Sequence, residues 1–411
     1  MKTSAVAAGP ATGTGPVGND RLFAAGEYAG YHNHLDAYGP LAAHLSGPGL
    51  IGELEVSGLT GRGGAAFPVW QKMAAVASSR TAGAVVVGNG AEGEPLSFKD
   101  NMLLQHAPHL VLDGLLAAAG AVRASRLYLY SQEPGLAPVR RALTERTDAG
   151  KVRLVPAPDT FVAGEASAVL NAIRTGTAVP VDRTQRLSET GLHGRPTLVH
   201  NVETLAHIGL IARFGAAWFR TAGTARDPGT RLISVSGDVP AATVLEVPGD
   251  VPVEDVLRAA QAVPDTLSAV RAGGYHGQWA APSGARLSAA GPERQTIRPG
   301  AGVLFALGRQ HCGLAATADV VNYLASQSAR QCGPCRFGLP ALADAWDQLA
   351  AGHGGPRLLR ELQRLGLLTA GRGACHHPDG TVRMAASALE FFAEDVRLHL
   401  AGGCNRQEGT P

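Results

Sequence analysis

Lysine is scarce in this 411-residue chain, which relies on arginine for most of its positive charge. Only four lysines occur: Lys2, Lys72, Lys99 and Lys151. In such a composition a retained lysine suggests a position that uses a compact charge on a flexible stem. Lys72 and Lys99 lie in two glycine-rich motifs, although two residues can also fall there by chance.

Other shortages exclude whole classes of protein. The formal net charge is only +2, so nothing indicates nucleic acid or an anionic membrane surface as a partner. No apolar run reaches the length of a membrane span, and residues 1–20 lack the apolar region of a signal peptide. Five cysteines, an odd number, fit a cytoplasmic metal or cluster site better than a disulfide framework. We therefore expect a cytoplasmic protein.

Glycine is abundant, and residues 58–72 (GLTGRGGAAFPVWQK) concentrate it. Gly61, Gly63 and Gly64 suit close approach of a ligand or positive φ. A helix expected to start at residue 65 would direct its N–H groups and dipole to the same point, where an anion such as phosphate binds. A plain turn before a helix explains the same pattern.

A second glycine-rich motif follows a short apolar strand. Residues 85–95 (VVVGNGAEGEP) place Asn89, Glu92 and Glu94 in one loop, and residues 97–100 (SFKD) come directly after it. Two such motifs so close together favour a ligand site over two unrelated turns.

The spacing of apolar residues predicts an α/β layer and then helices. After a helical lead-in over residues 21–57, strands at 84–87, 127–130 and 152–156 alternate with helices at 110–121 and 165–174, which indicates a largely parallel sheet. A strand, hairpin, helix and strand follow over residues 231–272. Four helices are expected over residues 320–331, 338–349, 358–367 and 385–400, as in a small bundle.

Five motifs in one order resemble the NADH-binding flavoprotein subunit of complex I and its relatives in NAD-linked hydrogenases and formate dehydrogenases. Besides the two glycine-rich motifs they are residues 161–171 (FVAGEASAVLN), 195–204 (RPTLVHNVET), and 331–336 (QCGPCR) with Cys375. The chain looks like a divergent, stand-alone member of that family.

The resemblance implies three domains. They are a Rossmann-like FMN-binding α/β domain at residues 21–228, a β-grasp (SLBB-like) domain at 229–298, and a four-helix bundle carrying an iron–sulfur site at 299–411. Residues 1–20 are expected to be a flexible tail.

The resemblance also implies the flavin site. FMN is expected on residues of the glycine loop, the acidic loop and the two later motifs: Gly61, Arg62, Gly63, Gly64, Lys72, Asn89, Glu92, Gly164, Glu165, His200, Asn201 and Thr204. The sequence departs from the family at Ala91, where the family has Asp, and at His200, where it has Asn. His200 could donate to a phosphate or flavin oxygen, or be an ordinary surface histidine.

The cluster motif is incomplete. The family has three cysteines spaced C-x-x-C-x-x-C and a fourth further on, which map to Ala329, Cys332, Cys335 and Cys375. Alanine cannot bind iron, so either the site holds a three-iron or open-corner cluster or the fourth iron of a 4Fe-4S cluster takes another ligand. The candidates for that ligand are His376, His377 and Cys404. A thioredoxin-like dithiol and a tetrahedral zinc site remain open for the same cysteines, and Cys312 is expected to be a buried thiol.

The sequence departs further from the family at the residues that the resemblance assigns to the nicotinamide site. Phe67 and Glu94 remain, and Glu94 is our candidate catalytic residue. A second stacking ring of the family is replaced by Ala75, and its second Glu by Ala166. Arginines at 183 and 186 replace its Lys and Phe, which suits a nucleotide 2′-phosphate.

Two functions follow. The first is an FMN- and iron–sulfur-dependent NAD(P)H dehydrogenase that passes electrons through the flavin to the cluster. The second is an electron-transfer adaptor that no longer binds NADH and works with a ferredoxin-like or membrane redox protein. A cofactor-free β-grasp interaction module would leave the motifs unexplained.

Overall fold

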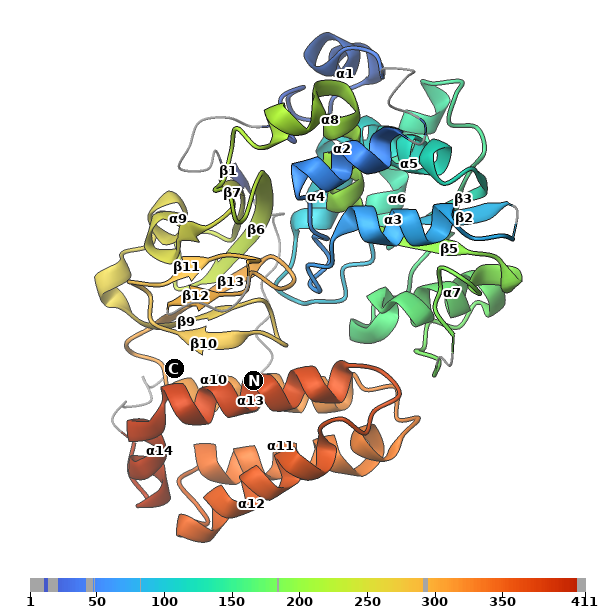
Figure 1. The fold of residues 1–411 in the computed structure, drawn as a ribbon. Coiled ribbons are helices and arrows are strands. Elements are labelled where there is room, and N and C mark those ends of the chain that lie inside the picture. The colour runs from blue at the N-terminus through green and yellow to red at the C-terminus, as the bar shows by residue number, and fades with distance from the viewer. Residues whose placement is uncertain are drawn as a thin grey trace.

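A computed structural model describes residues 11–13, 21–41, 47, 49–81, 83–182, 185–290 and 295–404. Figure 1 shows three parts: a four-stranded sheet with helices on both faces, a second and larger sheet, and a group of helices at the C-terminal end. The α/β fold with C-terminal helices that the sequence predicts is confirmed.

The first part is built on a parallel sheet with the strand order β4-β3-β2-β5. Its strands are β2 (Ala84–Asn89), β3 (Ala124–Ser131), β4 (Val152–Pro156) and β5 (Thr197–Asn201). The three predicted strands at 84–87, 127–130 and 152–156 all lie within these bounds. No strand was predicted at residues 197–201, where β5 lies.

Alternation along β2 explains why helices cover both faces of this sheet. Val85 and Val87 are buried against helix α7, whereas Val86 is buried in the cluster that includes helices α5 and α8. Figure 1 shows α7 on one side of the sheet and α5 and α6 on the other. The helices of this part are α1 (Tyr31–Tyr38), α2 (Gly49–Ser57), α3 (Val69–Ala77), α4 (Lys99–His106), α5 (Pro108–Ala121), α6 (Glu133–Thr144), α7 (Ala166–Thr175) and α8 (Val202–Phe219).

The second part is a six-stranded sheet with the order β1-β7-β6-β13-β9-β10, beside a small sheet β12-β11-β8. Their elements are β1 (Ala11–Gly13), β6 (Thr230–Gly237), β7 (Thr243–Pro248), β8 (Val251–Pro252), α9 (Val253–Ala259), β9 (Leu267–Ala272), β10 (Gln278–Ala280), β11 (Arg286–Leu287), β12 (Thr296–Ile297) and β13 (Val303–Gly308).

Two predicted boundaries of this part need correction. Strand β13 lies beyond residue 298, within the range we had given to the helical domain, yet it pairs with β6 and β9 in the middle of the sheet. Residues 11–13 of the predicted tail pair with β7 as an edge strand, and the rest of residues 1–20 lies outside the described part of the chain.

The third part is helical, with α10 (Gly313–Ser326), α11 (Leu339–Ala350), α12 (Gly355–Thr369), α13 (His377–Phe391) and α14 (Ala393–Leu400). Four long helices form the predicted bundle around Trp346 and Met384, both fully buried. The helix predicted at 385–400 is in fact the end of α13 and the whole of α14, separated at Phe392. Helix α10 ends at Ser326, so residues 327–333 form a loop before a π-helical turn at Pro334–Gly338.

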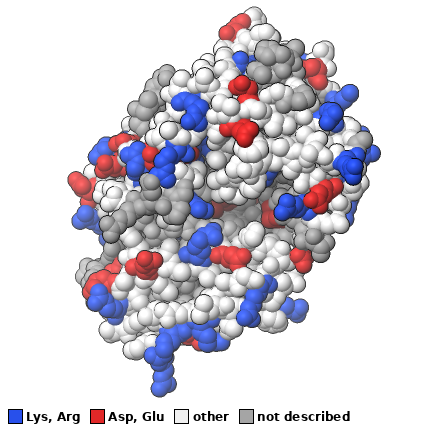
Figure 2. All heavy atoms as spheres, in the orientation of Figure 1, with Lys and Arg blue, Asp and Glu red and all other residues white. Residues whose placement is uncertain are grey.

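Hydrogen bonds join the three parts. The Phe98 N–H donates to Ser234 Oγ at 2.9 Å, and the Trp279 N–H donates to Ser387 Oγ at 3.2 Å. On the face shown in Figure 2, basic and acidic side chains are interspersed. Every helix within the described ranges is too short or too polar to cross a membrane.

Candidate flavin and iron–sulfur site

The glycine loop packs against the beginning of helix α8. Asn201 is the N-cap of α8, and its Oδ1 accepts a hydrogen bond from the Glu203 N–H at 3.0 Å. A Cβ on Gly63 would lie 3.2 Å from the Asn201 Cβ, and Gly64 has a φ of +106°. The loop thus brings bare backbone to a helix N-terminus, where N–H groups without intrahelical partners favour an anion.

The helix N-terminus beside the glycine loop does not belong to the helix that the sequence predicted. We expected a helix from residue 65, but α3 begins only at Val69, with Pro68 as its N-cap. Ala66 has a φ of +49°, and the residue before a proline avoids the helical region, so the chain cannot become helical earlier. Helix α8, much further along the chain, takes its place.

Arg62 anchors the glycine loop to helix α8 and strand β6. Its backbone N–H donates to Thr204 Oγ1 at 2.9 Å, and its guanidinium donates to the Thr230 carbonyl at 3.0 Å. The side chain is buried, and burial together with the Arg231 charge lowers the pKa of Arg62 to about 9. The guanidinium therefore joins the loop to strand β6, and the position offers a ligand its backbone rather than a free charge.

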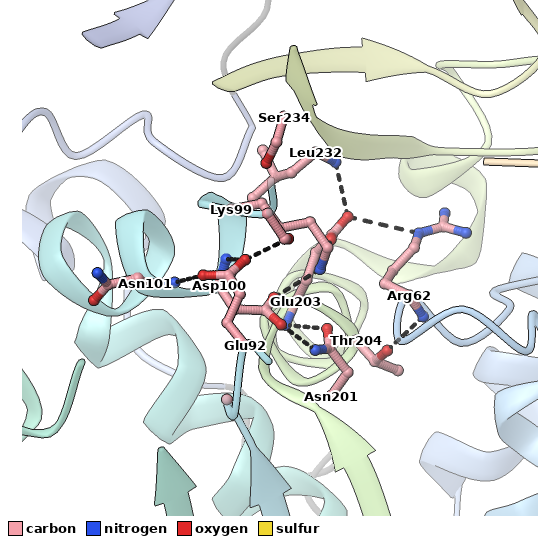
Figure 3. Close-up of polar contacts among 12 residues, drawn as sticks. Arg62, Glu92, Lys99, Asp100, Asn101, Asn201, Glu203, Thr204, Leu232 and Ser234 are labelled. Atoms are coloured by element: carbon pink, nitrogen blue, oxygen red, sulfur yellow. Dashed lines mark hydrogen bonds and ion pairs between the residues drawn. The ribbon is translucent and has the colours of Figure 1, made fainter. Parts of the chain in front are cut away.

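Lys99 is the centre of a buried ion network between α4, α8 and β6 (Figure 3). Its Nζ lies 2.7 Å from Asp100 Oδ1 and 2.8 Å from Glu203 Oε2, and Glu203 Oε1 accepts the Leu232 N–H at 2.8 Å. Burial acts to raise the pKa of Glu203, but the Lys99 charge helps to hold it at about 2. The retained lysine therefore supplies its compact charge to a buried ion network.

Glu92 organises the acidic loop. Its carboxylate accepts hydrogen bonds from Ser97 Oγ at 2.5 Å and from the N–H groups of Asp100 and Asn101, both at 3.0 Å. These amides belong to the first turn of α4, so Glu92 caps that helix. Burial and the neighbouring Asp100 raise the pKa of Glu92 to about 7.

Two asparagines lie at the carboxyl ends of adjacent strands. Asn89 Nδ2 donates to the Gly164 carbonyl at 2.9 Å, and Asn201 Nδ2 lies 3.3 Å from the Asn89 carbonyl. Glu165 is the N-cap of α7, where its Oε2 accepts the Ser167 N–H at 2.7 Å. The four sequence motifs of the predicted flavin site thus meet at one edge of the sheet, where ligands bind in open parallel sheets.

His200 is not the surface histidine that we left as an alternative. Its ring is buried, and burial together with the Lys72 charge lowers its pKa to about 3. Its Nε2 has no hydrogen-bond partner among the described residues. Lys72 itself is exposed, with Nζ 5.9 Å from the centre of the Phe67 ring, and that ring is 44% exposed. A neutral imidazole, an exposed ammonium group and an open aromatic face are therefore close to the glycine loop.

Glu94 lies where the first part meets the second sheet. Its Oε2 accepts the Tyr275 N–H at 2.8 Å, and its Oε1 is buried without a partner among the residues described. Burial raises the pKa of Glu94 to about 7, although Arg271 opposes this. The Arg271 guanidinium, itself buried, lies over the Tyr275 ring at 4.8 Å. A carboxyl with an unpaired buried oxygen and a pKa near neutrality is suited to contact a ligand.

Two of the positions that depart from the family's nicotinamide site are alanines, which offer little to a ligand. Ala75 is exposed on α3, and Ala166 is the first residue of α7. Arg186 is exposed, whereas Arg183 lies outside the described residues.

The three predicted cluster cysteines are neighbours in the helical part. Cys335 is buried in the π-helical turn before α11. Burial, and to a smaller extent the neighbouring thiols of Cys332 and Cys375, raise the pKa of the Cys335 thiol to about 12. Burial also raises the pKa of Cys375, and the charge of Glu165 adds to this effect. Cys375 lies two residues before His377, whose ring centre is 5.4 Å from that of Phe161 in the motif that precedes α7.

The structure distinguishes the candidates for a fourth ligand. Cys404 lies beside Cys312 and His399 instead of the cluster motif. His376 is exposed and pairs with Asp379. His377 is buried, donates through Nε2 to the Leu324 carbonyl at 2.9 Å, and has no partner for Nδ1 within the described part of the chain.

Comparisons with known proteins identify this arrangement. The family model "Nuo51 FMN-binding domain" matches residues 54–210, and "NADH-ubiquinone oxidoreductase-F iron-sulfur binding region" matches residues 315–399. The two matches together support a subunit of the NADH-quinone oxidoreductase F type. The chain contains the FMN-binding domain and the iron–sulfur binding region that these models describe, which confirms the predicted cofactors.

Similar proteins span nearly the whole chain. The corresponding NADH-quinone oxidoreductase subunit of Salmonella typhimurium is 26% identical over 85% of this chain and 84% of its own length, and that of Mycobacterium bovis is 27% identical over 90% and 89%. One chain of an NAD+-reducing NiFe hydrogenase superposes with a TM-score of 0.78 at 26% identity. That match covers 88% of this chain but only 64% of the hydrogenase chain.

Several residues at the site were not predicted. Gly300, with a φ of +50°, brings its carbonyl carbon within 3.8 Å of where a Gly64 Cβ would lie, and Arg271 faces Glu94 from β9. The sequence holds only weak signals for them: a Pro-Gly turn at residues 299–300 and one arginine within an apolar strand.

Proposed function

We propose that this protein is an FMN- and iron–sulfur-dependent oxidoreductase that passes electrons from NAD(P)H through the flavin to a 4Fe-4S cluster and on to a redox partner protein. One observation carries the proposal. The four motifs suited to a flavin meet at one edge of the sheet, and one of them contacts the cysteine segment: the centre of the Phe161 ring lies 5.4 Å from that of His377, two residues after Cys375.

The residues present fit FMN. The glycine loop leaves room that a Cβ at Gly63 would close, and the α8 N-terminus favours the phosphate. We assign the phosphate to the backbone of residues 61–64, with Lys72 supplying a positive charge. We assign contacts with the rest of the flavin to His200 Nε2, to Glu94 Oε1 and to the asparagines at the strand ends.

The flavin, when bound, accepts two electrons as a hydride and passes them on singly. The chain orients the partners of that reaction. Phe67 presents an open ring for stacking on the nucleotide base, an interaction of roughly 1–3 kcal/mol per base in nucleic-acid complexes. Glu94, held by the Tyr275 N–H, is placed to contact the nicotinamide end.

The proposal extends to the choice between NADH and NADPH. Loss of the second ring and of the second Glu weakens the site, so we expect weak nucleotide binding. Arg186 would pair with a 2′-phosphate, so NADPH is a candidate beside NADH.

The same losses favour a second function. With Ala75 and Ala166 in place of a ring and a carboxylate, the protein would instead act as an adaptor between a ferredoxin-like protein and another redox protein.

Stopped-flow reduction of the flavin under anaerobic conditions separates the two functions. The proposal expects NADH or NADPH to reduce the flavin. Reduction by reduced ferredoxin, with neither nucleotide active, would overturn the dehydrogenase and support the adaptor.

A further inference from the structure

A second group of metal-ligand side chains lies in the helical part, apart from the cluster motif. The ligand atoms of Cys312, His399 and Cys404 all lie within 4.8 Å of one another. Among the described residues this is the only group of three or more His, Cys, Asp or Glu side chains drawn so close. The three come from different segments: the residue before α10, helix α14, and the chain after α14.

The histidine is oriented as a metal ligand is. Its Nδ1 lies 3.0 Å from the Leu349 carbonyl, which makes Nδ1 the N–H donor and leaves the Nε2 lone pair free. Nε2 points to the Cys312 sulfur at 3.6 Å. Histidines that bind metals commonly donate their other N–H to a backbone carbonyl, which fixes the tautomer and the ring orientation. His399 is 2% exposed, so its orientation is set by packing.

The thiols complete a soft-ligand set. Cys312 is the N-cap residue of α10, and its sulfur lies 3.6 Å from His399 Nε2. Cys404 is exposed, so a metal can enter from solvent and keep a water molecule as fourth ligand.

We propose that Cys312, His399 and Cys404 bind one zinc ion, with solvent in the fourth position. Binding releases two protons as both thiols become thiolates, and the two thiolate charges neutralise the ion. The ion joins the start of α10, helix α14 and the following chain, and Leu349 extends the connection to α11. The proposal does not depend on the proposed redox function, because none of these residues belongs to the flavin site or to the cluster motif.

Zinc K-edge absorption spectroscopy on the purified holoprotein tests the site without interference from iron. We expect one zinc per chain after reduction and addition of zinc, with sulfur at about 2.3 Å and nitrogen or oxygen at about 2.0–2.1 Å. Competition with a chromophoric chelator should show at least a tenfold loss of zinc affinity in Cys404→Ser. Because Cys404 is exposed at the end of the described chain, this variant should fold.

Two control variants locate the ion. His353→Gln removes an exposed histidine of the same part and should keep wild-type affinity. Cys375→Ser removes a cluster cysteine and should also keep it. The proposal is overturned if Cys404→Ser binds zinc as wild type does, or if Cys375→Ser loses zinc to the same degree. A Cys312–Cys404 disulfide in protein purified under reducing conditions would overturn it as well.

Discussion

At the scale of single residues, the charged side chains of the motifs separate into two kinds. Lys99, Glu92 and Arg62 are bonded to other parts of the chain, so they shape the site rather than contact its ligand. Lys72 keeps its charge exposed, and Glu94 keeps an oxygen without a partner among the described residues. The sequence identified all five but could not separate them, because burial depends on contacts between residues far apart in the chain.

Replacing Gly63 with Val should abolish tight FMN binding. The new side chain would begin 3.2 Å from the Asn201 Cβ and occupy the space between the loop and α8. FMN content after purification measures this. Gly52→Val is the control, because a Cβ at Gly52 meets nothing within 4 Å. Equal FMN content in Gly63→Val and wild type would show that the flavin lies elsewhere.

Replacing Lys99 with Met should destabilise the protein strongly. It leaves Asp100 and Glu203 buried without their cation, and breaking a buried pair costs about 3–5 kcal/mol. The free energy of unfolding in urea measures the loss. Lys151→Met, at an exposed position, should change it by less than about 0.5 kcal/mol. Similar values for the two variants would mean that the network is not formed in solution.

Replacing Glu94 with Gln should flatten the pH dependence of stability. The folded pKa of about 7 exceeds the ordinary 4.5, so the unfolded chain loses this proton first as pH rises. Stability in wild type therefore falls between about pH 4.5 and 7, by about 3 kcal/mol from this group. The pKa of Glu92 is raised in the same way, so part of this pH dependence should remain in the variant. Urea unfolding at pH 5 and pH 8 measures the difference, and an unchanged slope in the variant would contradict the assignment.

At the scale of elements, strands were predicted better than the ends of helices. The buried valines of β2 sit in a run of apolar residues that turns define clearly at both ends. The start of α3 was misplaced because Ala66 takes a left-handed conformation, and nothing in an alanine signals that. Strand β13 was missed because a short apolar run looks alike in a strand and in a buried helix.

The loop between α10 and the π-helical turn contains the position at which the cluster motif lacks a cysteine. Ala329 lies there at the position of the missing cysteine, and Arg330 has a φ of +52°. Anaerobically purified protein should contain iron and sulfide, and Cys375→Ala should lose most of both. An iron without thiolate is more open to exchange, so Ala329→Cys should slow the loss of visible cluster absorbance in air. A cluster equally labile in Ala329→Cys and in wild type would contradict this reading of the gap.

At the scale of the whole molecule, the site exists only where the three parts meet. Glu94 is held by Tyr275 of the second part, and the Phe161 ring of the first part lies 5.4 Å from the His377 ring of the third. The motif order in the sequence indicated the three parts and their cofactors. It could not show these contacts, because they join segments that are distant in the chain.

The central claim is that electrons pass from a nicotinamide through FMN to the cluster. The most direct measurement mixes less than one equivalent of NADH or NADPH with oxidised holoprotein in an anaerobic stopped-flow instrument, and compares wild type with Cys375→Ala. We predict that the flavin is bleached in both, and that its absorbance then partly recovers in wild type alone as cluster absorbance falls. Failure of both nucleotides to bleach the flavin, or the same recovery without the cluster, would contradict the claim.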